Sequence, residues 1–167
     1  DLLDEARLTA EQLHGLALRR DVTVTVAGDP GHIQGSKKIV AEILHNLTDN
    51  AIQYNRPGGS VAITVTETDT EAAVSVRDTG IGIPREELPR IFERFYRVDK
   101  SHSRELGGTG LGLSIVKHGA ACHDAQLHVE STLGQGTEIT VTFPKKRPPS
   151  FAGSGPIQKR ETGIGEN

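Results

Sequence analysis

Residues 60–78 read SVAITVTETDTEAAVSVRD, and this stretch decides the class of fold. Apolar and polar residues alternate over 60–68 and again over 72–78, and a polar turn separates the two runs, which predicts a β-hairpin. A second pair of alternating runs, QLHVEST and GTEITVTF, flanks a turn at LGQG and predicts another hairpin. Hairpin strands pair antiparallel, so a purely parallel sheet is excluded.

The segments around these hairpins predict helices and one further strand. Helices are expected over 1–20, 37–55 and 110–122, and a strand over 22–26. Ser36 is expected to cap the second helix, and residues 79–98 are expected to begin as a loop and continue as short helical pieces. This mixture predicts an α+β fold, a two-layer sandwich in which one mixed, mostly antiparallel sheet carries helices on one face.

The chain of 167 residues is expected to form one compact domain over 1–144 and a flexible tail over 145–167. The segment 98–109 is polar and rich in glycine, and we expect it to be mobile. Because the chain begins with Asp1 and contains no methionine, we expect it to be a fragment of a longer polypeptide.

The amino-acid composition argues against nucleic acid and membranes as binding partners. The net charge of −3 gives no basic surface for nucleic acid. No apolar run is long enough to cross a bilayer, so we expect no direct membrane contact by this chain. The single cysteine, Cys122, is expected to be a small buried residue in a helix.

Residues 107–118, GGTGLGLSIVKH, place four glycines in six positions ahead of a helix. Leu113 stands where a dinucleotide-binding motif requires its third glycine. The chain also lacks the Gly-Lys pair of a P-loop and the HRD and DFG motifs of protein kinases. The loop nevertheless ends at a helix N-terminus, where N–H groups and the helix dipole favour a phosphate. The alternative is a tight turn without a ligand.

The helix expected over 37–55 carries a polar row. Glu42, Asn46 and Asn50 recur every four residues, with Asp49 and Gln53 beside them. Asparagine is a poor helix former, but its side-chain oxygen suits Mg²⁺. The row therefore indicates a ligand-binding face, and a solvated face is the alternative.

Asp78 ends a predicted strand next to Gly80 and Gly82. Its carboxylate could accept a hydrogen bond from an exocyclic amine such as N6 of adenine. The alternative is a turn in which the carboxylate binds only nearby backbone.

Five stretches stand in a fixed order: NLTDNAIQY, DTGIGIP, IFERFYRVD, GGTGLGLSIVKH and STLGQGTEITVTFP. They resemble the N box, the first glycine box, the phenylalanine box, the second glycine box and the closing hairpin of one family. That family is the catalytic and ATP-binding domain (HATPase_c) of bacterial two-component sensor histidine kinases, in the superfamily with gyrase, Hsp90 and MutL. The resemblance covers residues 3–144 and implies the Bergerat (GHKL) sandwich fold, with ATP under a mobile lid at 98–109.

The resemblance implies catalytic roles for matching residues. Asn50 would ligate Mg²⁺, and Asn46 would support it. Glu42 would orient or deprotonate the histidine that accepts the phosphoryl group. Arg97, and with it Arg94, would reach the γ-phosphate of ATP.

The resemblance also implies how the nucleotide is held. Asp78 would accept from adenine N6, Tyr54 would cover the adenine or ribose, and Phe92 and Phe95 would pack at the base of the lid. The other nucleotide-binding positions would be Gly80, Gly82, Ile83, Gly108, Thr109, Gly110, Leu111, Gly112, Leu113 and Thr137.

None of the seven histidines stands in the context of a phosphoacceptor. The resemblance therefore implies a dimerisation domain carrying that histidine elsewhere in the parent, a downstream response regulator, and a cytoplasmic position in a protein of the bacterial cell membrane. This chain departs from the family at Gln53, where a basic residue often stands, and at Asp124 and Ala125, where two glycines are usual.

Two other functions stay open. An ATP-driven clamp of the same superfamily would carry a glutamate at the position of Asn46. An anti-sigma-type partner-switching kinase would keep both glycine boxes.

Overall fold

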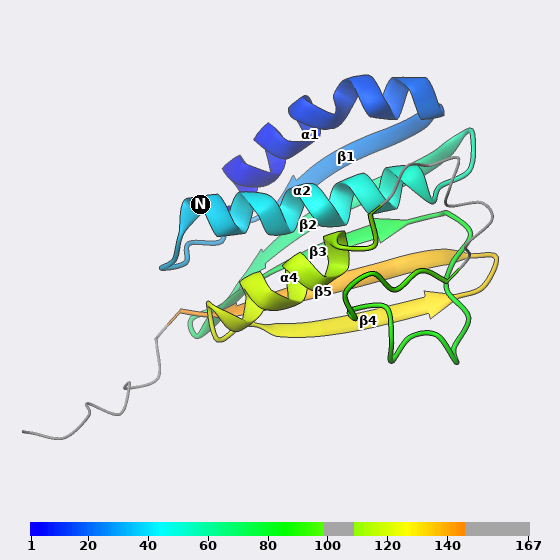
Figure 1. The fold of residues 1–167 in the computed structure, drawn as a ribbon. Helices are drawn as coiled ribbons and strands as arrows, with labels where there is room; N and C mark the ends of the chain where they lie inside the picture. The colour runs from blue at the N-terminus through cyan, green and yellow to red at the C-terminus, as the bar shows by residue number, and fades with distance from the viewer. Residues whose placement is uncertain (99–108, 146–167) are drawn as a thin grey trace, which may run out of the picture.

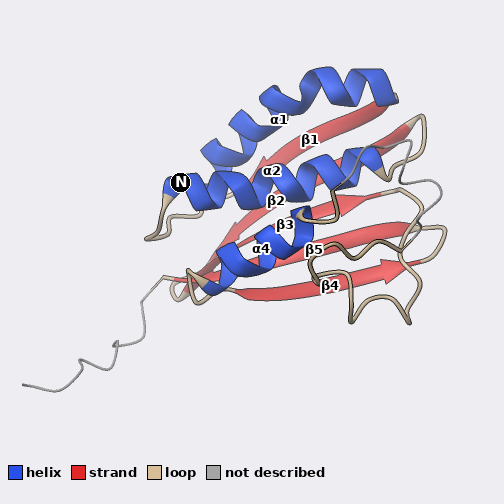
Figure 2. Ribbon diagram, in the orientation of Figure 1, coloured by secondary structure: helices blue, strands red, loops and turns tan. Residues whose placement is uncertain are grey.

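The computed structural model describes residues 1–98 and 109–145, in which three helices cover one face of a five-stranded sheet (Figures 1 and 2). The predicted two-layer α+β fold is confirmed. The helices are α1 (Leu2–Arg20), α2 (Lys37–Gln53) and α4 (Gly112–Ala121). The strands are β1 (Val22–Gly28), β2 (Gly59–Glu67), β3 (Glu71–Asp78), β4 (Gln126–Thr132) and β5 (Gly136–Pro144).

The strand order is β1-β2-β3-β5-β4. The outer strand β1 runs parallel to β2, and the other neighbours are antiparallel, so the sheet is mixed as predicted. Both predicted hairpins are present, as β2–β3 and β4–β5. Most of the expected lid and tail, residues 99–108 and 146–167, lies outside the described residues.

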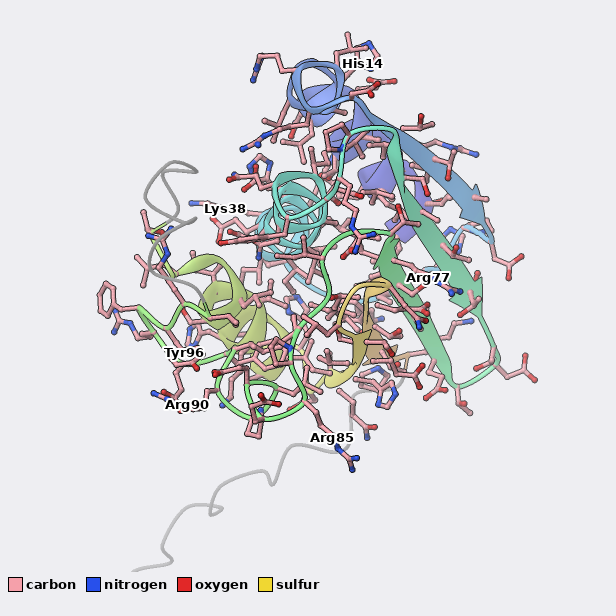
Figure 3. The ribbon with its side chains drawn as sticks, turned by 90° about the vertical axis from the view of Figure 1, so that its right-hand side faces the viewer. His14, Lys38, Arg77, Arg85, Arg90 and Tyr96 are labelled. Atoms are coloured by element: carbon pink, nitrogen blue, oxygen red, sulfur yellow. The ribbon has the colours of Figure 1, made fainter. Side chains whose placement is uncertain are left out.

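The core lies between the sheet and the helices because every second residue of each strand points to the helix side. Two cross-strand rows on that side are apolar. They are Val65, Val74, Val141 and Leu127, and next to them Ile63, Val76, Ile139 and Val129. The central helix α2 packs on these rows with Ile43, Leu44 and Ile52, which are fully buried. Figure 3 shows Arg77 of β3 pointing to the opposite side of the sheet.

The end of the sheet where β2 finishes is fastened by Glu67. Its carboxylate accepts from the backbone N–H groups of Gly31 and His32 at 3.0 and 3.3 Å and from Lys145 Nζ at 2.7 Å. The Lys145 ammonium and the two N–H groups lower the pKa of Glu67 to about 2. This cluster joins the loop before α2 to the end of β5.

Two local expectations were wrong, and a third was met only in part. Residues 79–98 form turns without a helix, because Pro84 and Pro89 remove N–H donors and disfavour helical backbone before them. Ser36 is the N-cap residue of α2, as expected, but its side chain makes no capping hydrogen bond. Its backbone N–H donates to His123 Nε2 at 3.0 Å. Cys122 is exposed, because it follows exposed His118 by four residues, on the side of α4 that faces away from the core.

Candidate functional site

The third helix-facing row of the sheet changes from apolar to polar. It begins at buried Val61, which pairs with Asp78, and Thr137 pairs with Ser131 on the neighbouring strands. The N–H of Thr137 donates to Asp78 Oδ1 at 3.2 Å, which links β5 to the end of β3. Three polar side chains thus stand side by side where the hydrophobic core ends.

Asp78 is half-buried in this row. Its Oδ1 also accepts from the N–H of Gly80 at 2.8 Å, so the backbone turn that was the alternative to a ligand is present at this oxygen. Burial raises the pKa of the Asp78 carboxyl above its usual value, against the two N–H donors, which lower it. Among the described residues no hydrogen bond reaches Oδ2, so this oxygen can still accept from a ligand.

The first glycine box is pressed against the end of α2. A Cβ on Gly80 would lie 2.3 Å from the carbonyl oxygen of Tyr54, so a side chain at this position is excluded by backbone. The N–H of Ile81 donates to the same carbonyl at 3.1 Å. Tyr54 in turn donates its N–H to the carbonyl of Asn50, one helical turn earlier, at 3.0 Å. The loop that follows Asp78 is therefore fastened directly to the last turn of α2.

The N-terminus of α4 faces the polar row of α2. A Cβ on Gly112 would lie 3.0 Å from Asn46 Oδ1 and 3.5 Å from Asn50 Nδ2. The first N–H groups of a helix have no partner within it, and Leu111 at the N-cap supplies no side-chain bond. These N–H groups and the two carboxamides can together surround an anion and its metal ion.

The sequence profile of the family described as histidine kinase-, DNA gyrase B-, and HSP90-like ATPase (HATPase_c) matches residues 35–147, more than half of the chain. The chain belongs to this ATPase family.

Named relatives of this HATPase_c domain are sensor histidine kinases. The sensor histidine kinase WalK of Bacillus subtilis (strain 168) is 38% identical over 151 residues, which are 87% of this chain and 23% of WalK. The sensor histidine kinase RppB of Synechocystis sp. is 41% identical over 138 residues, 82% of this chain and 30% of RppB. The chain therefore spans less than a third of the length of either relative.

Solved structures of histidine kinases share the fold. The mycobacterial sensor histidine kinase MprB superposes with a TM-score of 0.70 at 30% identity, covering 83% of this chain and 92% of that one. The nucleotide-free catalytic domain of histidine kinase ThkA gives 0.73 at 25% identity, with 85% and 92% covered. Full-length ShkA, solved in complex with AMPPNP, gives 0.74 at 29% identity, with 90% and 32% covered. The fold of this HATPase_c domain is that of histidine kinase catalytic domains.

The structure brings many of the predicted site residues into two groups. Asn46, Asn50 and Gly112 form one, and Tyr54, Asp78, Gly80 and Thr137 form the other. Gly82 and Ile83 adjoin the second group, because Gly82 packs on the carbonyl of Thr132 and Ile83 donates its N–H to Ser131 Oγ at 2.8 Å. Glu42 is exposed one turn before Asn46, and its carbonyl accepts from Asn46 Nδ2 at 2.7 Å.

The phenylalanine box lies beside the second glycine box. The N–H of Phe95 donates to the carbonyl of Gly110 at 2.9 Å, although the ring of Phe95 is 67% exposed and does not enter the core. Arg90 stacks on the Tyr96 ring at 4.1 Å, and Figure 3 shows these two side chains together. A hollow of about 440 Å³ is lined by Arg90, Phe95, Tyr96, Arg97 and Val98.

The remaining residues that were predicted to bind the nucleotide belong to neither of these two groups. Arg94 is exposed beside Phe95, and Arg97 is half-buried in the wall of the hollow. Leu111 caps α4, and Leu113 packs partly buried against the core. Thr109 is exposed, and Gly108 lies outside the described residues.

Sequence reasoning missed Ser131. Its Oγ lies within 3.0 Å of groups in the first glycine box and in β5. Its position in the sequence could have revealed it. Ser131 and Thr137 are equally far from the turn of the β4–β5 hairpin, so a tight turn makes them cross-strand partners.

Within the described residues, no helix is long and apolar enough to cross a bilayer. In the same part of the chain, no group of three or more histidine, cysteine, aspartate or glutamate side chains could hold a metal ion.

Proposed function

We propose that this domain binds ATP with Mg²⁺ and presents the γ-phosphoryl group to a histidine on a separate dimerisation domain of its parent kinase. The observation that carries the proposal is the close approach of Gly112, at the N-terminus of α4, to Asn46 and Asn50. Bare backbone with unused N–H groups on one side and carboxamides on the other suits a polyphosphate and its metal ion.

The adenine would lie over the polar row of the sheet. Asp78 Oδ2 would accept from the amine at position 6, the glycines at 80 and 82 would form the floor, and Tyr54 would cover the adenine or ribose. The backbone around Gly110 and Gly112 would cradle the phosphates. The rest of that cradle, with the lid, falls outside the described residues.

The metal ion would be held by Asn50, with Asn46 supporting it. Bound Mg²⁺ would neutralise charge on the phosphate oxygens. Phosphoryl transfer is accelerated mainly by positioning of the reactants and by such electrostatic stabilisation. Because Mg²⁺ prefers oxygen ligands and keeps several waters, phosphate oxygens of the nucleotide and water would complete its coordination.

In the transfer step, an imidazole nitrogen of the acceptor histidine forms a bond to the γ-phosphorus, and the bond from that phosphorus to the bridging oxygen of ADP breaks. Glu42 is exposed on the same face of α2 as Asn46, so it can orient the imidazole and take the proton it loses. Arg97 and Arg94 would stabilise the charge on the transferring group.

The parent would be a sensor kinase of a two-component system, with this domain on the cytoplasmic side of the bacterial membrane and a response regulator downstream. The sensor histidine kinases among its relatives support this assignment.

Calorimetric titration of the chain with ATP and Mg²⁺ tests the site. Asn50→Ala removes the proposed metal ligand, and Asp78→Asn removes the carboxylate that would accept from the adenine amine. Each variant should lower the affinity for ATP at least about tenfold. Matched controls are Gln12→Ala on the exposed side of α1 and Asp69→Asn in the exposed β2–β3 turn, and both should bind like the parent chain. Undiminished binding by both site variants would contradict the assignment.

A second assay separates the kinase from the ATPase clamp. The isolated chain contains no phosphoacceptor context, so it should neither accumulate phosphohistidine nor turn ATP over rapidly. Rapid hydrolysis by the chain alone would favour the clamp.

A further inference from the structure

Ser131 occupies a position that no motif identified. Its Oγ lies 2.8 Å from the backbone nitrogen of Ile83, 3.0 Å from the carbonyl oxygen of Gly136 and 2.8 Å from Thr137 Oγ1. One hydroxyl thus connects the first glycine box, the start of β5 and the side chain next to Asp78.

The chemistry of these groups fixes the direction of each hydrogen bond. The N–H of Ile83 can only donate, and the carbonyl of Gly136 can only accept. A serine hydroxyl has one proton and two lone pairs. All three contacts are satisfied when Ser131 donates to Gly136 and accepts from both Ile83 and Thr137. The proton of the Thr137 hydroxyl is then committed to Ser131.

This arrangement makes the sheet side of the pocket a surface of acceptors. Thr137 Oγ1 has no proton left for a ligand, and its backbone N–H is already bound to Asp78 Oδ1. Asp78 offers Oδ2, which is also an acceptor when ionised. Two neighbouring acceptors match an amino group, which carries two protons, and repel a carbonyl oxygen.

We propose that Ser131 is a positioning residue that holds Thr137 as an acceptor, and that it thereby selects 6-aminopurine over 6-oxopurine nucleotides. The proposal rests on the nucleotide site described above and adds to it the source of base selectivity. Without Ser131 the Thr137 hydroxyl could turn and donate its proton to an oxygen at position 6.

The test compares ATP with ITP, which carries an oxygen at position 6 and no amine at position 2. Dissociation constants for both with Mg²⁺ are measured on the parent chain, Ser131→Ala, Thr137→Val and the double variant. Ser131→Ala should lower the preference for ATP over ITP at least about fivefold. In the Thr137→Val background, Ser131→Ala should leave the preference unchanged, because there is no threonine proton to direct.

The controls separate selectivity from folding. Ser75→Ala, on the face of β3 that carries Arg77, should change neither affinity. A purely structural role for Ser131 would weaken ATP and ITP equally, or would change the preference equally in both backgrounds, and either result overturns the proposal. If Ser131→Ala does not fold, two further variants keep the test. Ser131→Cys preserves the shape of the side chain but accepts hydrogen bonds poorly, so it should still lower the preference for ATP over ITP. Ser131→Thr keeps the hydroxyl and should retain that preference. An unchanged preference in Ser131→Cys also overturns the proposal.

Failure of the wider site assignment looks different. If the parent chain binds neither nucleotide, both the proposed function and this inference fall. If it binds ATP and Ser131→Ala binds with unaltered preference, only the role of Ser131 is wrong.

Discussion

The two ends of the candidate site are built differently. At the Asp78 end, the polar groups are already bonded to one another, with Gly80, Thr137 and Ser131 held by protein partners at 2.8–3.2 Å. At the α4 end, the carboxamides of Asn46 and Asn50 face bare backbone at Gly112. The first end is preorganised before any ligand arrives, whereas the second leaves donors that a ligand can use. Changes at the first end should therefore affect folding and recognition of the base, and changes at the second should affect mainly the binding of the phosphates and their metal ion.

The largest expected effect is on stability at the preorganised end. Gly80→Ala would bring a methyl group against the backbone carbonyl of Tyr54, which cannot move away as a flexible side chain can. We expect the free energy of unfolding to fall by about 2–3 kcal/mol, measured by urea denaturation. Gly15→Ala is the matched control. It meets only the tip of the Arg19 side chain in the middle of α1, and should raise stability by about 0.5–1 kcal/mol. Equal effects from the two variants would contradict this account.

A glycine-to-alanine substitution at the α4 end should instead affect nucleotide binding. Gly112→Ala places a methyl group 3.0 Å from Asn46 Oδ1, in the gap where the phosphates would lie. We expect the affinity for ATP with Mg²⁺ to fall about tenfold. The free energy of unfolding should change by less than about 0.5 kcal/mol, because alanine is the better residue at the start of a helix. A large loss of stability with intact binding would remove the distinction between the two ends.

A smaller effect is expected on the core side of α2. Thr48 lies between the two asparagines in sequence but is fully buried, and its Oγ1 has no hydrogen-bond partner among the described residues. Thr48→Val should raise the free energy of unfolding by about 1 kcal/mol and leave nucleotide affinity unchanged. Thr9→Val is the control, because the buried Thr9 hydroxyl donates to the carbonyl of Glu5 at 2.9 Å and should give no gain. A loss of stability in Thr48→Val would mean that its hydroxyl has a partner.

A pH dependence of stability is expected far from the site, at Glu67. The pKa of Glu67 is lowered to about 2 in the folded protein from 4.5, so the folded state binds fewer protons between these values. The stabilisation that Glu67 provides is therefore present above pH 4.5 and is lost as the pH falls toward 2. Glu67→Gln should flatten this part of the stability curve, as urea denaturation at a series of pH values would show. Nucleotide affinity at pH 7 should not change, since Glu67 lies at the opposite end of β2 from the residues around Asp78.

The sequence predicted the parts of the fold and site that depend on local pattern. The helix at α2 and its row of Glu42, Asn46 and Asn50 follow from a spacing of four residues, and the hairpins follow from alternation around turns. Each of these signals lies within one helix or within two strands joined by a short turn, so no knowledge of tertiary contacts was needed.

What the sequence could not supply were contacts between elements. Ser131 acts through its register with Thr137, and the approach of Gly112 to Asn46 depends on how α4 packs against α2. The same limit applies to Ser36, whose N–H donates to His123 far along the chain, and to Cys122, whose exposure depends on which side of α4 packs on the core. The prolines at 84 and 89, by contrast, were visible signals against helix that the prediction for 79–98 underweighted.

Amide chemical shifts measured on the ¹⁵N-labelled chain during titration with Mg²⁺ and a non-hydrolysable ATP analogue test the central claim most directly. The account predicts that the N–H signals of Gly112, Leu113 and Ser114 shift together with those of Gly80 and Thr137, while those of Gly31 and His32 at the Glu67 cluster stay in place. Saturable binding that leaves the α4 signals unmoved, or that shifts the Glu67 cluster instead, would contradict it.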